Sequence, residues 1–335
     1  MKKLLIILGV MCSAAGMVFA APIQIKLASI APEATAWGRA LNQMAKEWAA
    51  ATGGEVRLIV YHNGMLGSAE GEVLKKLRMN QVQAAVFTSV GMNGISKKIF
   101  TLSAPLLVRN DEEMDYVLSS LGPDLEQTIE QSGFKLAAWS RVGWIRFFGR
   151  QPISAPDDLR KQKLAAPDDM PELSNIFKSM GYTCIPVSYN DTLIALSSNK
   201  VDAVFQVPPF VAAMQIFGVA KNMCQLDVAP VLGGIVMNQA TWKRIPDKYK
   251  PRLIEIARKI ARENDAGAKK LTSDAIDIMR RNGLVTNPFS APDEQLWVDE
   301  VRKAIPEMLE VRDSVLDQDI YHRTEALLQT VRSRR

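Results

Sequence analysis

The sequence predicts an α/β protein of two domains, and three observations indicate this fold class. Strand-like and helix-like patterns alternate from residue 23 onwards, which is typical of sheets covered by helices. About 315 residues follow an N-terminal leader, more than one hydrophobic core usually holds. A charged helical pattern over residues 247–282 is long enough to lie across two domains rather than inside one.

The first half of the chain alternates strands and helices. Residues 23–30 (IQIKLASI) are β-branched and alternate, as a first strand should. Residues 37–51 place Trp37, Leu41 and Trp48 at helical spacing, and Gly53 and Gly54 end that helix. Further strands are expected at 56–61, 82–88 and 135–139, and helices at 69–79, 111–121 and 123–132. This order predicts a parallel or mixed sheet.

The second half repeats this alternation. Strands are expected at 144–148, 164–167, 184–187, 201–207 and 233–238, and helices at 171–180, 191–198 and 247–282, the last with a kink at Gly267. Ser154-x-x-Asp157 and Ser290-x-x-Asp293 have the spacing of capping boxes before helices. These carboxylates are therefore interpreted as helix caps and not as catalysts.

The first twenty residues are typical of a secretory signal peptide. A basic start precedes an apolar run at residues 4–10, and small residues end at Ala20. The sequence thus indicates export to the periplasm. Lipid anchoring at Cys12 is the alternative, disfavoured because Met11 stands where a small residue is expected. Of the two mature cysteines, Cys184 and Cys224, separate buried thiols are favoured over a disulfide.

Composition argues against several classes of function. The chain has two histidines, His62 and His322, which disfavours histidine triads and multi-histidine metal sites. The net charge of +5 is mild, so no nucleic acid partner is expected. Ser197-x-x-Lys200 matches an acyl-enzyme motif but lacks its companion motifs, and no nucleotide signature occurs. The sequence predicts a protein that is not an enzyme and needs no cofactor or metal.

Five segments in register carry a family resemblance. They are KLASIAPE (26–33), HNGMLGSAEGEVLKKLRMNQVQAA (62–85), FTLSAPLLVRNDEEM (100–114), PISAPDDLRKQKL (152–164) and ALSSNKVDAVFQVPP (195–209). The chain resembles the DctP-like solute-binding (P) subunit of TRAP transporters over nearly its whole mature length. The resemblance implies two α/β domains, 22–143 with 232–271 and 144–231 with 272–330, that close on a ligand around hinge strands. It also implies a long helix bridging both domains and a membrane permease as partner.

The family resemblance also implies where a ligand should bind. Members place a carboxylate-binding arginine where this chain has Ala165 and an asparagine where it has Val207, whereas Arg146 matches an upstream arginine. A lysine nearby does not replace a guanidinium that binds a carboxylate through two parallel hydrogen bonds. Aromatic residues surround these positions, so we expect a hydrophobic or amphipathic ligand. An organic acid held by Arg146 is the alternative.

A second alternative is an envelope interaction or sensory module. One branch of the resembling family works with periplasmic TPR-repeat proteins, and the missing arginine makes that branch attractive. Loops after parallel strands face the ligand crevice of open α/β sheets, which adds Thr88 to the candidates. The residues predicted to bind ligand are Trp37, Met65, Thr88, Trp139, Trp144, Arg146, Ala165, Phe205, Gln206, Phe210 and Asn238.

Overall fold

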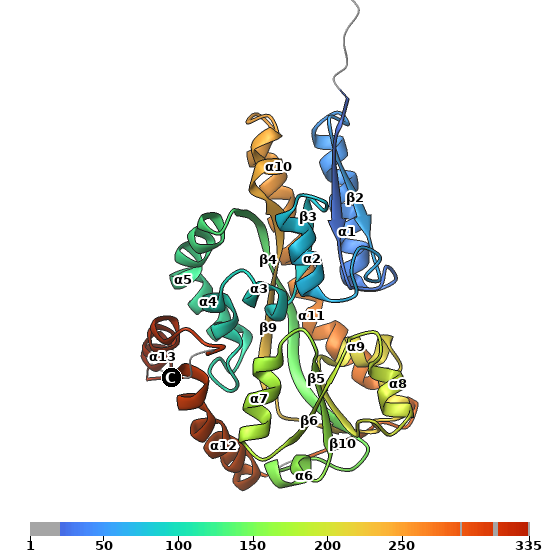
Figure 1. The fold of residues 1–335 in the computed structure, drawn as a ribbon, viewed down its shortest axis with the longest axis vertical. Coiled ribbons are helices and arrows are strands. Elements are labelled where there is room, and N and C mark those ends of the chain that lie inside the picture. Colours follow the sequence, from blue (N-terminus) through green and yellow to red (C-terminus); the bar gives the residue numbers. More distant parts are fainter. Residues whose placement is uncertain (1–20, 289, 311–313, 334–335) are drawn as a thin grey trace, which may run out of the picture.

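The protein folds into two α/β lobes that share a pair of long strands (Figure 1). The structure is a computed structural model that describes residues 21–288, 290–310 and 314–333. The expected signal peptide, the alternative anchor Cys12 and the last two arginines lie outside the described residues. The mixed α/β architecture with a long bridging helix confirms the predicted fold class, and the domain boundaries given above stay a prediction.

The strands form one hydrogen-bonded sheet that runs through both lobes. They are β1 (Ile23–Ala28), β2 (Val56–Tyr61), β3 (Ala84–Phe87), β4 (Phe134–Gly149), β5 (Lys163–Pro167), β6 (Thr183–Val187), β7 (Ala203–Gln206), β8 (Asn222–Cys224), β9 (Ala229–Asn238) and β10 (Val285–Asn287). Their order is β2-β1-β3-β9-β4-β7-β5-β6, with β8 pairing β4 and β10. β1 pairs in parallel with β2 and β3, whereas β9 is antiparallel to both of its neighbours.

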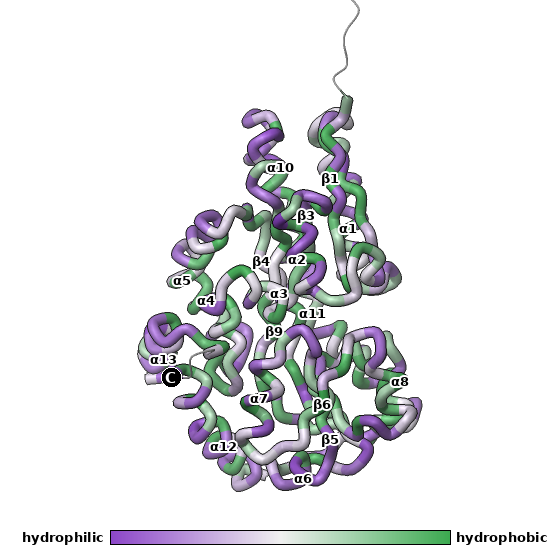
Figure 2. Tube along the Cα trace, viewed as in Figure 1, coloured by the Kyte–Doolittle hydropathy of each residue, from purple (hydrophilic) through white to green (hydrophobic). Residues whose placement is uncertain are grey.

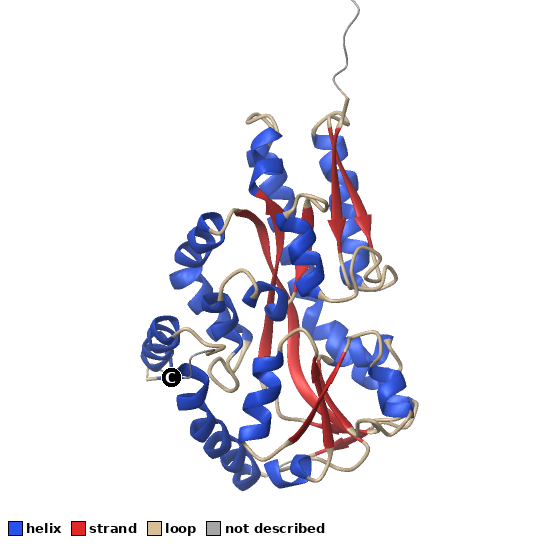
Figure 3. Cartoon of the chain, viewed as in Figure 1, coloured by secondary structure: helices blue, strands red, loops and turns tan. Residues whose placement is uncertain are grey.

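Helices cover the sheet in each lobe (Figure 3). They are α1 (Ala36–Ala51), α2 (Glu70–Arg78), α3 (Ser89–Asn93), α4 (Lys97–Phe100), α5 (Asp111–Gln131), α6 (Pro156–Arg160), α7 (Pro171–Ser179), α8 (Thr192–Ser197), α9 (Pro208–Ala213), α10 (Gln239–Arg244), α11 (Lys250–Arg281), α12 (Ala291–Glu310) and α13 (Gln318–Arg332), with the 3₁₀ helices η1 (Thr101–Ser103) and η2 (Ile216–Gly218). Hydrophobic segments follow the strands, whereas the outer ends near α10 and α6 are hydrophilic (Figure 2). Within the described residues no helix is both long and apolar enough to cross a membrane.

β4 and β9 connect the lobes. β4 pairs with β9 over Phe134–Ile145 and then with β7 and β8 near its end. The sequence predicted two separate strands here, and that prediction was wrong. The residues between them stay extended because they continue to hydrogen-bond to β9, with register shifts at Leu136/Ala138 and Arg141/Gly143.

α11 spans 32 residues and packs against both lobes, which confirms the predicted bridging helix. Its first half buries Leu253 and Ile256 in the core beside α1, where Trp48 Nε1 donates to the Leu253 carbonyl at 3.1 Å. Its last turn buries Met279 in the core of the second lobe. The helix is continuous through Gly267, and the kink expected there stays a prediction.

Two predicted helix boundaries were wrong. Residues 111–131 form one helix, α5, because Leu121, Leu125 and Ile129 continue a single buried face past the exposed Pro123. In α6 the carboxylate that accepts from the Ser154 and Ala155 N–H groups belongs to Asp158 rather than to Asp157. Proline at the first helical position moves that helix start one residue onward.

Two other local predictions are confirmed. Ser290 and Asp293 form the predicted capping box, in which the Ser290 N–H donates to Asp293 Oδ2 at 2.9 Å. Cys184 and Cys224 are buried free thiols.

Candidate functional site

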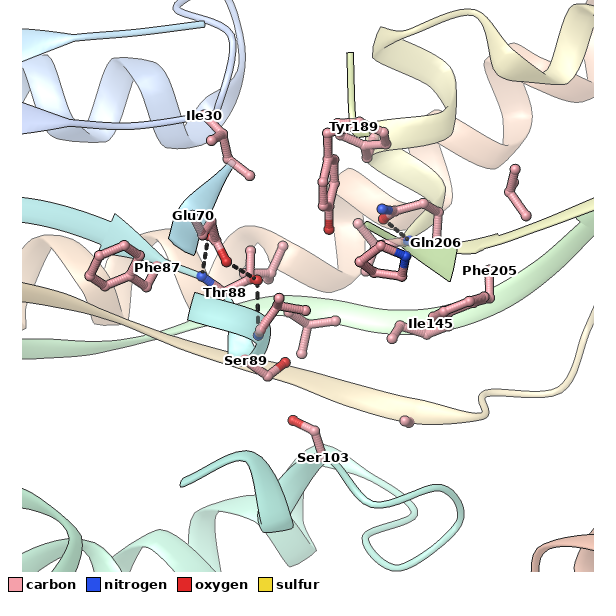
Figure 4. Close-up of a pocket in the computed structure, with 18 of the residues that line it drawn as sticks. Ile30, Glu70, Phe87, Thr88, Ser89, Ser103, Ile145, Tyr189, Phe205 and Gln206 are labelled. Carbon is pink, nitrogen blue, oxygen red and sulfur yellow. Dashed lines mark hydrogen bonds between the residues drawn. The ribbon is translucent and has the colours of Figure 1, made fainter. Parts of the chain in front are cut away.

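A cavity of about 190 Å³ lies between the two lobes. The first lobe contributes the segments that follow β1 and β3, and the second contributes the ends of β5 and β7. β4 and β9 also contribute side chains to the lining (Figure 4). Carboxyl ends of parallel strands are the usual ligand-binding edge of an open α/β sheet. The cavity is therefore the candidate binding site.

Glu70 contributes a buried carboxylate to the first-lobe side (Figure 4). Its side chain is 3% exposed. Oε1 accepts from the Thr88 N–H at 2.7 Å, while Oε2 accepts from Thr88 Oγ1 and the Gly91 N–H, each at 2.7 Å. Burial raises the pKa of Glu70 to about 7, although these hydrogen bonds oppose the rise. The carboxyl thus fastens α2 to the loop that leads from β3 into α3.

Tyr189 and Gln206 face the first lobe from the opposite side of the cavity (Figure 4). Gln206 Oε1 accepts from the Val207 N–H at 3.1 Å, which leaves its amide NH₂ as the donor end. The Tyr189 ring packs edge-on against Phe210 at 5.3 Å between centroids. Burial raises the pKa of Tyr189, so its hydroxyl stays protonated at neutral pH. The second lobe therefore supplies neutral hydrogen-bonding groups.

The rest of the lining is mostly apolar. Phe205 contacts Phe177 and Phe147, with ring centroids 5.3 and 6.5 Å apart. Among the described residues that line the cavity, Glu70 is the only acidic one, and none is Lys, Arg or His. Trp37 also lines the cavity, and its buried Nε1 has no hydrogen-bond partner in the described part of the chain. The site thus offers apolar surface and uncharged donors but no cation.

The side chains of β4 separate the cavity from a groove on the other face of the strand. Ser140, Val142, Ile145 and Phe147 line the cavity, whereas the residues between them line the groove. The interval from Val142 to Ile145 is three residues instead of two, and it coincides with the register shift at Arg141/Gly143. A bulge of this kind exchanges the faces of all residues that follow it.

The groove has a volume of about 840 Å³ and contains ion pairs between β4 and neighbouring elements. Asp265 of α11 accepts from the Arg141 N–H at 3.0 Å and from its Nε at 3.3 Å. Arg146 Nε donates to Asp227 Oδ1 at 2.7 Å. These contacts tie the bridging helix and the β8–β9 connection to the strand that joins the lobes.

The family is decided by comparison with known proteins. The profile of the DctP family, described as bacterial extracellular solute-binding protein, family 7, matches residues 27–311. The chain belongs to this family. This DctP-family protein is 20% identical over 280 residues to the sialic acid-binding periplasmic protein SiaP of Vibrio cholerae, covering 82% of this chain and 83% of that one. It is 23% identical over 306 residues to the C4-dicarboxylate-binding protein DctB of Bacillus subtilis, covering 87% of each.

Solved structures of TRAP periplasmic solute-binding proteins share the fold. One from Chromohalobacter salexigens with bound D-glucuronate superposes with a TM-score of 0.83 at 18% identity, covering 90% of this chain and 99% of that one. One from Sulfurospirillum deleyianum with bound succinate gives 0.82 at 18% identity, covering 92% and 100%. The resemblance to TRAP solute-binding proteins that the sequence indicated is confirmed.

Six of the predicted ligand-binding residues lie together in the cavity lining. They are Trp37, Thr88, Ala165, Phe205, Gln206 and Phe210. Ala165 is 8% exposed on β5, at the position where the family resemblance implied an arginine. Their roles in binding stay predictions, but the fold brings both lobes' candidates to one site.

The other five predicted residues lie outside this cavity. Trp144 and Arg146 face the groove, because the β4 bulge turns them away, and Trp144 Nε1 donates to Asp111 Oδ1 at 3.1 Å. Trp139 packs against the hydrophobic core. Asn238 caps α10 by accepting from the Ala240 N–H, and Met65 is 71% exposed on the loop after β2.

The sequence analysis missed several residues of the lining. Glu70 lies inside a quoted family segment, and its place at the start of a helix that follows a strand could have drawn attention to it. Ile145 was missed, and Phe147 was counted among the surrounding aromatic residues but not among the predicted ligand-binding residues, because the bulge that turns both inward has no clear sequence signal. Tyr189 comes from the connection between β6 and α8, and Ser103 from the short 3₁₀ helix η1, and both positions depend on the tertiary fold.

Proposed function

We propose that the protein captures a neutral apolar or amphipathic solute between its lobes in the periplasm and delivers it to a TRAP-type membrane permease. One observation carries this proposal: the described lining of the cavity contains no cation, and Ala165 occupies the place of the expected arginine. Lobe closure around the solute would be the signal that the permease recognises.

A carboxylate ligand would be poorly compensated in this cavity. A desolvated charge without a partner typically costs about 2–5 kcal/mol. The buried Glu70 carboxyl adds like charge at the same site once it ionises. An apolar ligand instead gains about 25 cal/mol for each Å² of surface that it buries. The balance therefore favours an uncharged ligand.

An organic acid held by Arg146 is the alternative. Two of the relatives described above are named for the acids that they bind, and one solved structure contains bound D-glucuronate. In this chain Arg146 lies in the groove and is paired with Asp227. To reach the cavity it would have to break that ion pair and cross to the other face of β4. Nothing in the described residues favours a TPR-repeat partner, so that partner stays a prediction from the sequence.

The size of the cavity sets the scale of the solute. An apolar cavity of about 150 Å³ holds benzene, so 190 Å³ encloses roughly eight non-hydrogen atoms, and a slightly longer chain can extend out because the cavity is not closed. Mass spectrometry of the protein purified without denaturation, followed by titration calorimetry, tests the proposal. We expect an uncharged, mostly apolar molecule of this size, and weak or undetectable binding of succinate and D-glucuronate. Submicromolar binding of either acid would overturn the proposed ligand class.

Permease delivery has its own test. Vesicles that contain the permease should accumulate the identified solute only when the purified protein is added. Uptake at the same rate without the protein would contradict the transport role, whatever the ligand is.

A further inference from the structure

Three serine side chains line an otherwise largely apolar part of the cavity. Ser89, Ser103 and Ser140 are 4%, 6% and 7% exposed. They come from α3, η1 and β4, so three separate elements bring them to one space. The Ser103 hydroxyl points from η1 across a gap toward α3, where Ser89 lies (Figure 4).

The fold does not use the Ser103 hydroxyl. Ser103 Oγ is buried and has no hydrogen-bond partner among the described residues. Its neighbour Thr101 supplies the local contacts instead, because its Oγ1 donates to the Lys97 carbonyl and accepts from the Asp317 N–H. A buried hydroxyl without a partner lowers stability, and such a group in a native structure calls for a ligand or a water.

Ser89 is likewise not needed to cap its own helix. Thr88 is the N-cap of α3, and its Oγ1 accepts from the Val90 N–H at 3.2 Å. Ser140 sits on β4 opposite Gly233 of β9, where the main chain is already paired. All three serine hydroxyls can therefore turn toward a molecule in the cavity, and each can both donate and accept.

We infer that these serines form a polar subsite for an uncharged hydrogen-bonding group of the ligand, such as a primary amide or a hydroxyl. This inference rests on the proposed function and narrows it, because it assigns the ligand a neutral head beside an apolar body. A carboxylate is a poor match, since hydroxyls alone do not neutralise its charge and the described lining supplies no cation.

Binding of octanamide and octanoate tests this subsite. The two have nearly the same shape and differ in charge. In titration calorimetry at pH 8 we expect the wild-type protein to bind octanamide at least tenfold more tightly than octanoate. Ser103→Ala should weaken octanamide binding about three- to tenfold, the range of one lost neutral hydrogen bond, and should leave octanoate binding nearly unchanged.

Ser174→Ala is the matched control. Ser174 is also a buried serine, but it does not line the cavity. We expect it to leave both affinities unchanged. If Ser103→Ala fails to fold by circular dichroism, Ser140→Ala takes its place with the same expected loss.

The outcomes separate the two proposals. Equal octanamide affinity in the wild type and in the folded serine variant overturns the subsite while leaving an apolar ligand in place. Equal or tighter binding of octanoate by the wild type also overturns it. Failure of the wild type to bind either probe, together with tight binding of succinate, overturns the proposed function itself.

Discussion

Replacing Glu70 with glutamine should remove a measurable pH dependence of stability. The Glu70 pKa is about 7 in the folded protein and 4.5 without the surrounding fold. Because the pKa of Glu70 is higher in the folded than in the unfolded protein, the neutral side chain contributes its full stability below pH 4.5. This contribution to the free energy of unfolding is lost as the pH rises through 7. At 1.36 kcal/mol per pKa unit, the loss is about 3 kcal/mol.

Urea unfolding at pH 5 and pH 8 measures this effect. The glutamine of Glu70→Gln cannot ionise. Between pH 5 and pH 8 we therefore expect the free energy of unfolding of the wild type to fall by about 2–3 kcal/mol more than that of the variant. At pH 5 the variant itself should be less stable by about 1–3 kcal/mol. The reason is that the Thr88 and Gly91 N–H groups each donate to a different oxygen of Glu70, and the NH₂ group of glutamine cannot accept one of these hydrogen bonds.

Glu72→Gln is the control for this experiment. Glu72 lies on the same helix, but its side chain is 48% exposed and pairs with Lys76, whose hydrogen bond lowers the Glu72 pKa. Its pH dependence is therefore small and of opposite sign. If Glu70→Gln and the wild type lose equal stability between pH 5 and pH 8, the assignment of Glu70 as a buried, destabilised carboxylate is wrong.

Four further changes test the site and the fold. Ala165→Arg should weaken octanamide binding at least tenfold and give measurable succinate binding by calorimetry; unchanged affinities for both would contradict the role of this position. Arg332→Met should lower the free energy of unfolding measured in urea by about 2 kcal/mol, because the Glu113 carboxylate, 4% exposed, loses its ion pair. A loss below about 0.5 kcal/mol would contradict a stabilising role for this ion pair. Gly233→Ala should cost about 3 kcal/mol or more, since its Cβ would lie 2.1 Å from a main-chain oxygen of β3. A Cβ at Gly267 would meet nothing within 4 Å, so Gly267→Ala should raise the free energy of unfolding in urea by about 0.5–1 kcal/mol. Equal effects of the two glycine changes would refute this account.

Much of the fold could be predicted because local patterns agree with it. The alternating strands, the amphipathic α1 and the long α11 each bury the face that their periodicity indicates. The predictions that failed depended on tertiary contacts. Pro123 stays inside a helix because the packed face continues beyond it, and β4 stays extended through Gly143 because β9 supplies its hydrogen bonds.

The candidate site was harder to predict, for a specific physical reason. Simple alternation from Ser140 would place Trp144 and Arg146 on the cavity face of β4. The bulge at Arg141/Gly143 adds one residue, so Ile145 and Phe147 face the cavity instead. Whether the site has a cation is thus decided by one extra residue in a strand, which hydrophobic periodicity does not reveal.

The position of β9 has a consequence for how the chain reaches its native state. β9 lies between β3 and β4 in the sheet but follows β3 by more than 140 residues in the sequence. The first lobe therefore cannot complete its sheet until nearly three quarters of the chain is present, and the closure of so long a segment makes folding slow. A chain that ends before Ala229 would leave β3 without its second neighbour and most of β4 unpaired, and such open strand edges invite aggregation.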